Sequence, residues 1–387
     1  MFRRFISFEL KLIVKNKKHL MIMFLMILIF PLFYIQQLNE TEQTLAEQKE
    51  MEAASLNAQL DRMANLEETL TEQEEAVQDS LLNQLSHVNM QAYYLNNDRE
   101  LYIEEGLALV EEQRHVQELN HAGMSERFIM KEDQIKSEEE RLLYIQEHSL
   151  PLTQDSSTAS NFLVNALKTL SGLLFTIIIL FSGSEIISYE NRHKTVMNGI
   201  PVSTFTKILS KLTTHSIYLT LSLIVGVFIG GIVSTWYSGI GHLNYPVIIY
   251  RNGTYTAIST IEYILFVIGL LFLVTIFILL LSVLLNMIFD HAFINLVVGT
   301  GVFLLPALLS NIFGEVSFLQ PLLFVDVTSV LSGEFANQLS NPSVDYYYAI
   351  LWLIGLCIIT FLCIYMNKLL KTSKGFKMNK RQNSVHM

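Results

Sequence analysis

Long, nearly uncharged apolar runs alternate with polar segments along this chain, and the alternation predicts several membrane-spanning helices. About 20 residues of helix cross the hydrocarbon of a bilayer, where every backbone polar group must be paired internally. Six stretches have the required character: Leu20 to Ile35, Phe162 to Ile187, His215 to Trp236, Ile261 to Phe289, Ala292 to Phe313 and Tyr347 to Met366. We interpret the first as a retained anchor, because no small-residue cleavage site follows its basic flank.

Residues 38–160, between the first two runs, have the composition of a helical domain. No proline lies between Pro31 and Pro151, and most residues there are good or tolerable helix formers. Apolar residues recur every three or four positions from Leu56 to Val88, which gives one stripe along a helix. Glu67 and Glu74 interrupt a strict heptad, so we expect an antiparallel hairpin or a short coiled coil.

Turn signals divide this domain into three expected helices. Residues 96–98 and 121–123 have turn composition, and Ser125 is expected to cap a last helix that reaches about His148. The predicted fold is therefore an all-α membrane protein with six spans and one helical, coiled-coil-like domain.

The distribution of charge predicts which side of the membrane each segment faces. The first nineteen residues and the tail from Asn367 each carry six Lys and Arg, and such residues accumulate on the cytoplasmic side. Segment 38–160 instead holds 8 Lys and Arg against 27 Asp and Glu, so its local net charge is −19. We expect a multi-pass protein of a bacterial cell membrane, with both termini in the cytosol and segment 38–160 outside.

Motifs for catalysis, metal binding and nucleotide binding are absent from the sequence. It has no glycine-rich loop ending in Gly-Lys-Ser/Thr, no His-Glu-x-x-His and no Gly-x-Ser-x-Gly. We therefore expect no catalytic residue, metal or cofactor in this chain, and no nucleic acid as a partner. Charges deep in a bilayer usually mark ion pathways, and the expected spans hold almost none. If the chain is a pump, its energy must come from elsewhere.

Three segments outside the regular spans have unusual composition. Residues 1–19 alternate apolar and basic side chains at helical spacing, as an interfacial amphipathic helix does. Residues 184–212 form a basic loop after the second span. Residues 314–345 contain a stretch that is too apolar for a simple loop and too short to cross the membrane.

At these segments the sequence resembles the membrane subunits of ABC type-2 exporters, in the subgroup with a large insert after the first span. The family pattern after the second span has an acidic residue, a Thr, then Pro-Val/Ile-Ser and a Lys. Glu190, Thr195, Pro201, Val202, Ser203 and Lys207 or Lys211 match it. Lys194 stands where the family commonly has Gly, and the interval from Thr to Pro is shorter than usual.

The resemblance implies a permease subunit that docks on a separate cytosolic ABC ATPase, which would carry ATP and magnesium. The implied coupling residues are Glu190, Arg192, Lys194, Thr195, Pro201, Val202, Ser203, Lys207 and Lys211. The implied outer re-entrant segment includes Gln320, Pro321 and Leu322. A second permease copy or a related permease would complete a dimer, and we expect Glu190 and Lys207 at an exposed cytosolic contact.

The implied domain order follows from the same resemblance. It is a connecting helix in 1–19, a first span in 20–37, the acidic domain in 38–160, five spans in 161–370 and a basic tail in 371–387. For a permease of this kind, the expected substrate is an amphipathic peptide, lipid or toxin. A sodium ion ranks lower, because the spans hold no buried carboxylates.

Two other readings stay open. The chain could be a receptor or scaffold whose helical domain binds a partner while the spans serve as an anchor, and an intramembrane enzyme ranks third. Arg192, Lys194, Lys207 and Lys211 could also simply bind lipid phosphates of the bilayer. We expect Gly226 and Gly230 to allow close packing of the third span against a neighbouring helix. Asn252-Gly253-Thr254 forms a glycosylation sequon that has no meaning in a bacterial protein.

Overall fold

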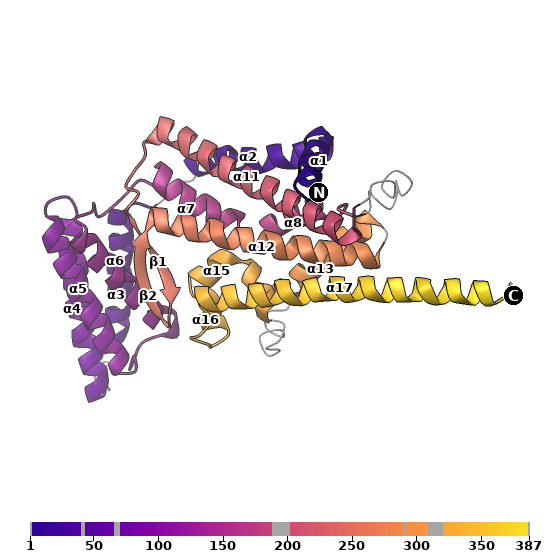
Figure 1. Cartoon of the computed structure of the whole chain (residues 1–387). Coiled ribbons are helices and arrows are strands. Elements are labelled where there is room, and N and C mark those ends of the chain that lie inside the picture. The colour runs from indigo at the N-terminus through magenta and orange to yellow at the C-terminus, as the bar shows by residue number, and fades with distance from the viewer. Residues whose placement is uncertain are drawn as a thin grey trace. The chain divides into compact units, whose positions relative to one another are not determined.

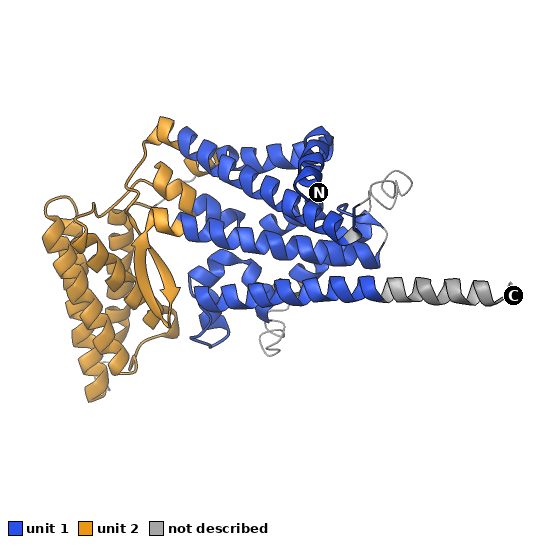
Figure 2. Cartoon of the chain, viewed as in Figure 1, with its two compact units in different colours: residues 1–33, 165–233, 264–387 blue, residues 34–164, 234–263 orange. Residues whose placement is uncertain are grey.

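The described part of the chain is mostly helical and contains one two-stranded antiparallel sheet (Figure 1). The computed structural model describes residues 2–39, 43–65, 70–187, 202–289, 291–308 and 320–385. The chain divides into two compact units (Figure 2). Unit 1 contains Met1–Phe33, Asn165–Val233 and Ile264–Met387, and unit 2 contains Tyr34–Val164 and Ser234–Tyr263.

Helices of different lengths, most of them apolar, dominate unit 1, and several extend into residues of unit 2. Their bounds are α1 (Phe2–Lys15), α2 (Lys17–Leu38), α7 (Ala159–Leu170), α8 (Leu173–Gly183), α11 (Thr204–Ser238), α12 (Thr260–Ile288), α13 (Ala292–Leu308) and α17 (Tyr346–Val385). Three short elements precede α17: the 3-10 helix η3 (Gln320–Val325), α15 (Val327–Leu331) and α16 (Glu334–Gln338).

Four helices in the described part of the chain are long and apolar enough to cross a membrane: α2, α11, α12 and α17. The pair α7 and α8 would make a fifth span, but the two helices meet at an angle of 62°. The expected span from Phe162 to Ile187 is therefore interrupted by a bend, and its place as the second crossing stays a prediction. The expected span from Ala292 to Phe313 contains α13, which is described only as far as Leu308, so six spans stay a prediction.

The break between α7 and α8 lies at Ser171 and Gly172, next to the start of α15. Gly172 has φ +78°, a region that glycine enters without the steric cost of a Cβ. A Cβ at this position would lie 3.0 Å from Asp326 Oδ2. Ser171 Oγ donates a hydrogen bond to Asp326 Oδ1 (3.4 Å) and accepts one from the Thr328 amide (3.3 Å). The broken helix is thus fixed to the cap of α15.

Glycines bring helices of unit 1 close together, and α2 runs beside α11 (Figure 1). A Cβ on Gly226 of α11 would lie 2.7 Å from the Met26 carbonyl of α2. A Cβ on Gly183 at the end of α8 would lie 2.5 Å from Ser282 Oγ of α12. The expected packing role of Gly226 is confirmed.

Unit 2 contains a helical domain with four helices where we expected three. They are α3 (Leu45–Ala64), α4 (Glu72–Tyr94), α5 (Arg99–Glu118) and α6 (Glu132–Glu147), with the 3-10 helix η2 (Glu126–Phe128) before α6. The first expected helix is split between Ala64 and Glu72. Thr71 begins α4 with a capping box: its hydroxyl accepts the Glu74 amide, and Glu74 Oε2 accepts the Thr71 amide. Glu74 interrupts the heptad because it belongs to a helix start.

The other helix boundaries of this domain agree in part with the turn signals. The turn at 96–98 is confirmed, since Asp98 accepts hydrogen bonds from the Glu100 and Leu101 amides at the start of α5. The turn at 121–123 is also present, and the last helix ends at Glu147. Ser125 as its cap is wrong, because α6 begins only at Glu132 and Ser125 precedes η2 without a side-chain cap bond.

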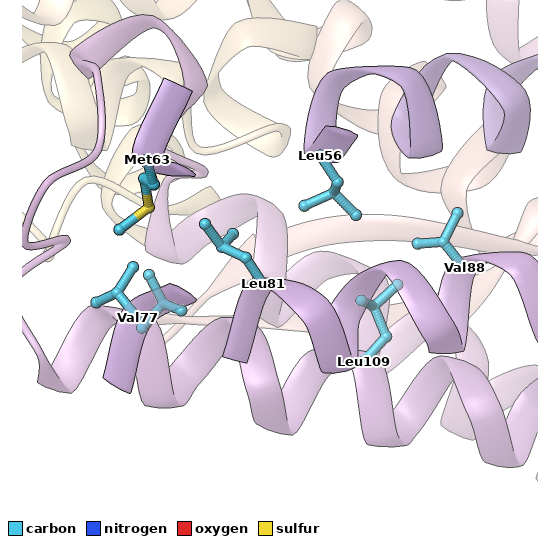
Figure 3. Packing of buried hydrophobic residues seen from close by; sticks show 7 residues of the cluster. Leu56, Met63, Val77, Leu81, Val88 and Leu109 are labelled. Carbon is cyan, nitrogen blue, oxygen red and sulfur yellow. The ribbon is translucent and has the colours of Figure 1, made fainter. Parts of the chain in front are cut away.

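The core of the helical domain is built from the predicted stripe. Leu56 and Met63 of α3 point toward Val77, Leu81 and Val88 of α4 and toward Leu109 of α5 (Figure 3). All are less than 8% exposed. A second cluster joins α5 and α6 through Tyr102, Ile103, Leu142 and Ile145. The stripe is therefore an internal core of several short helices.

A β-hairpin in unit 2 was not expected from the sequence. Its strands are β1 (Pro246–Arg251) and β2 (Thr254–Ser259), paired so that Arg251 faces Thr254. Asn252 and Gly253 form the two-residue turn with φ of 53° and 81°, the left-handed values that tight hairpins require. Helix α6 packs against both strands. The segment 234–263 is therefore part of a folded unit.

Candidate functional site

The structure describes only part of the expected coupling segment. Glu190, Arg192, Lys194, Thr195 and Pro201 lie outside the described residues. Val202 and Ser203 precede α11, where Ser203 is exposed and its Oγ accepts the Thr206 amide (3.2 Å). Lys207 and Lys211 follow on the first turns of α11.

Both lysines are buried, which corrects the expected exposure of Lys207. Lys207 is 7% exposed and Lys211 is 5% exposed. The α11 helix begins at Thr204, well before the expected span start at His215, so both lysines lie on a packed helix. They belong to the interior of unit 1.

Lys211 connects three segments of unit 1. Its Nζ lies 3.9 Å from Glu9 Oε1 of α1 and donates a hydrogen bond to the Ile186 carbonyl (3.0 Å), which follows α8. Glu9 is only 3% exposed. A buried charge pair contributes little net stability, but removing one partner leaves an uncompensated buried charge. This one ammonium group therefore holds α1, α11 and the end of the second expected span together.

A second pair joins the start of α2 to the same segment. Lys18 Nζ lies 3.5 Å from Glu185 Oε2 and donates a hydrogen bond to Ser184 Oγ (3.3 Å). It also lies 4.5 Å from the centre of the Phe181 ring, within the range of a cation–π contact. Glu185 keeps 37% of its side chain exposed, so solvent screens this pair more than the Glu9–Lys211 pair.

Next to the two ion pairs, polar side chains of α2, α8 and α11 form a hydrogen-bonded network. His215 Nδ1 donates to the Lys211 carbonyl (2.9 Å), and the His19 ring meets the His215 ring edge to face at 5.1 Å. His19 Nδ1 and the Tyr218 hydroxyl share a hydrogen bond (3.3 Å), and Tyr218 is also hydrogen-bonded to Ser182. These groups satisfy one another inside an apolar bundle, where an unpaired polar group would be costly.

A cavity of about 370 Å³ opens beside this network. Its polar lining comes from Glu9, Lys15, Asn16, His19, Lys211 and His215, and Glu185 also borders it. Within the part of the chain that the structure describes, no group of three or more His, Cys, Asp or Glu is arranged to hold a metal ion. The arrangement is a charged joint that links α1, α2 and α11 to the residues after α8.

The expected outer segment forms a separate cluster in unit 1. Gln320, Pro321 and Leu322 begin η3, and Pro321 is buried. This 3-10 helix contacts α13, α15 and α17. Residues 320–338 thus contain three short helices, of which α15 contacts the break between α7 and α8 through Asp326 and Thr328. The re-entrant character of the segment stays a prediction.

Sequence reasoning missed Glu9, His19, His215 and Tyr218. A signal for Glu9 was present: it is the single acidic residue in the first nineteen, and it lies four residues from both Phe5 and Ile13 on the apolar face. Phe5, Glu9 and Ile13 are the buried residues of α1. A lone acid on an apolar face predicts a buried basic partner.

The chain matches no known protein family, no characterised protein and no solved structure.

Proposed function

We propose that the chain is the permease subunit of an ATP-binding-cassette exporter that moves an amphipathic substrate outward and is powered by separate ATPase subunits. The observation that supports this best is the position of Lys211. It bonds to Glu9 of the amphipathic helix α1 and to Ile186, so it joins both flanks of the residues that resemble a coupling segment.

This geometry fits a mechanism in which an ATPase pushes on the coupling segment. A push on residues 188–201 by an ATPase would act on Ile186 and on the start of α11, which Lys211 ties together. Because Glu9 is bonded to the same ammonium group, α1 would move with them. The second pair, Lys18 with Glu185, would carry the start of α2 along. A rigid-body motion of these helices is the expected coupling step.

The finer features of the proposal are the six spans and the sidedness. We propose that α13 continues as the fifth of six spans, that both termini face the cytosol of a bacterial cell, and that the helical domain of unit 2 lies outside as a short coiled coil. A second permease copy or a related permease would complete the transport pathway. The described spans carry few carboxylates, which favours an amphipathic substrate over sodium.

A receptor or scaffold is the second candidate, and one observation favours it. The helical domain of unit 2 has its own buried core, as expected of an independent binding module. An anchor would not need the charged joint around Lys211, whereas a permease would use it.

Purification of the tagged full chain from its native membranes in mild detergent separates the two candidates. A permease should bring down an untagged protein with a P-loop and should stimulate its ATP turnover. Ser203→Trp, at an exposed position beside the coupling segment, should weaken this association. Ser332→Trp is the matched control, because Ser332 is also an exposed serine next to a helix end. Recovery of the chain without any P-loop protein, from cells that express it at its natural level, would favour the receptor.

A further inference from the structure

We propose that the helical domain of unit 2 binds the tryptophan side chain of a cationic peptide, in a pocket between α3, α4, α5 and the segment before α6. This site is independent of the proposed export function. It would exist equally in a receptor, so its failure and the failure of the export proposal are distinguishable.

The pocket is a cavity of about 150 Å³ beside the core of Figure 3. Its apolar walls are Leu56, Leu81, Val116, Met124, Phe128 and Ile135. They come from α3, α4, α5, η2 and α6, together with the turn after α5. An apolar cavity of this size in another protein accepts a benzene ring, so one aromatic side chain fits.

The mouth of the pocket is lined by soft, adaptable side chains. Met124 is half-buried, Phe128 is half-buried, and Met130 is 37% exposed. Methionine adjusts its shape easily, and its sulfur makes favourable contacts with aromatic rings. The backbone before them turns sharply, with φ of 54° at His121 and 74° at Gly123. This part of the lining is suited to closing over an inserted ring.

Gln59 contributes an amide oxygen that has no hydrogen-bond donor. It lines the pocket from α3, is only 6% exposed, and its Oε1 is buried without a hydrogen-bond partner. Buried acceptors are nearly always satisfied, because leaving one without a donor is costly. A donor carried by an apolar body would satisfy this oxygen once the Gln59 side chain turns toward the pocket.

An indole meets both requirements better than the other aromatic side chains. Its N–H only donates, so it can satisfy Gln59 without bringing another acceptor into the pocket. A phenyl ring has no donor, and a tyrosine hydroxyl adds acceptor lone pairs next to an acceptor. Tryptophan is also one of the residues enriched at interface hot spots, which lie in well-packed central pockets.

Charge favours a basic carrier for this tryptophan. Segment 38–160 has 8 Lys and Arg against 27 Asp and Glu, and Glu52 lines the pocket itself. Glu52 already pairs with Lys49 (2.8 Å), so its charge and those of the other acids act mainly through the field around the domain. Such a field raises the local concentration of cationic partners and speeds their encounter.

The test is fluorescence anisotropy of a short fluorescein-labelled peptide of Lys and Ser with one central Trp, titrated with the full chain in detergent. The same peptide with Ala or Phe in place of Trp should bind at least about tenfold more weakly, as loss of an anchor residue does. A peptide in which Glu replaces Lys should bind much more weakly at low salt.

Variants of the chain assign the binding to the pocket. Gln59→Leu removes the acceptor at similar volume, so it should weaken the Trp peptide about tenfold while leaving the Phe peptide unchanged. Ser55→Tyr fills the pocket from its half-buried edge and should abolish the difference between the Trp and Ala peptides. Gln73→Leu, at an exposed position of α4, should change nothing. Circular dichroism of each variant checks its fold.

Two results would overturn the proposal. Equal affinity for the Trp, Phe and Ala peptides would mean that only charge attracts them. Binding of free indole in the pocket, with no preference among the peptides, would mean that the occupant is a small molecule.

Discussion

Glu9 of α1 and Lys211 of α11 form an ion pair with 3.9 Å between Oε1 and Nζ, although both side chains are buried. Glu9 lies in the basic segment 1–19 and Lys211 in the basic segment 184–212. From the sequence alone, charged side chains in such segments are expected to face lipid headgroups. In the structure they face each other. Two predictions about stability follow from this pair and from the break at Gly172.

Lys211→Met should destabilise the chain strongly, because it leaves the Glu9 carboxylate buried without its partner. Losing one member of a buried pair costs about 3–5 kcal/mol. Thermal unfolding in detergent, followed by circular dichroism, should show a clear drop in midpoint. The double variant Glu9→Gln with Lys211→Met should recover most of the loss, because the pair then leaves no uncompensated charge behind.

Lys18→Met is the matched control for this prediction. Its partner Glu185 is partly exposed, and solvent reduces the cost of an unpaired charge there. The change in midpoint should be much smaller than for Lys211→Met. Similar losses for the two variants would show that the Glu9–Lys211 pair is not special.

Gly172→Ala should destabilise the break between α7 and α8. The backbone there has φ +78°, and the new Cβ would lie 3.0 Å from Asp326 Oδ2. With ψ at −131° this backbone lies in a region that essentially only glycine enters, and holding a residue with a Cβ there costs on the order of 1–3 kcal/mol before any clash. Gly355→Ala in α17 is the control, because a Cβ there meets no atom within 4 Å. It should be neutral or slightly stabilising, since alanine favours helix. Unfolding in detergent measures both, and a stable Gly172→Ala protein would contradict the bent geometry.

How much the sequence predicts can be judged at these positions. The apolar run from Phe162 to Ile187 predicts one span, and a single glycine in such a run is ordinarily tolerated within a helix. The bend depends on Asp326, whose bond to Ser171 spans 155 positions of the chain. Local pattern carries no information about a contact at that distance, so the break could not have been predicted.

The hairpin, by contrast, had a usable signal. Asn252 and Gly253 stand between two runs rich in β-branched and aromatic residues, which is the strongest short-range sign of a two-residue hairpin turn. We interpreted Asn252 only as part of a glycosylation sequon. The capping boxes at Thr44 and Thr71 were readable in the same way, since each has Glu three residues later. The burial of Lys207 depends on packing between helices that are distant in the sequence, so no local sequence motif indicates it.

Thr71→Ala should destabilise the helical domain of unit 2 by about 1 kcal/mol, because it removes the cap that begins α4. Thr71→Ser keeps the hydroxyl and should behave like the natural residue. Hydrogen exchange of the full chain in detergent should show faster exchange of the Glu74 amide in Thr71→Ala alone. Unchanged exchange would mean that the capping box does not form in solution.

The last prediction concerns sidedness, on which the proposed coupling to an ATPase depends, because an ATPase reaches residues 184–212 only if they are cytosolic. Six bases in the first nineteen residues and six in the tail, each worth about 1 kcal/mol of attraction to an anionic inner leaflet, favour cytosolic termini. Single cysteines can be placed at the exposed residues Gln73 and Ser203, in a background with Cys357 and Cys363 replaced by Ser. Ser80 is unsuitable as an outer probe, since it is only 2% exposed. On intact cells an impermeant thiol reagent should label Gln73→Cys but not Ser203→Cys, and permeabilised cells should give labelling at both. Labelling of Ser203→Cys alone on intact cells would invert the topology and remove the basis of the export proposal.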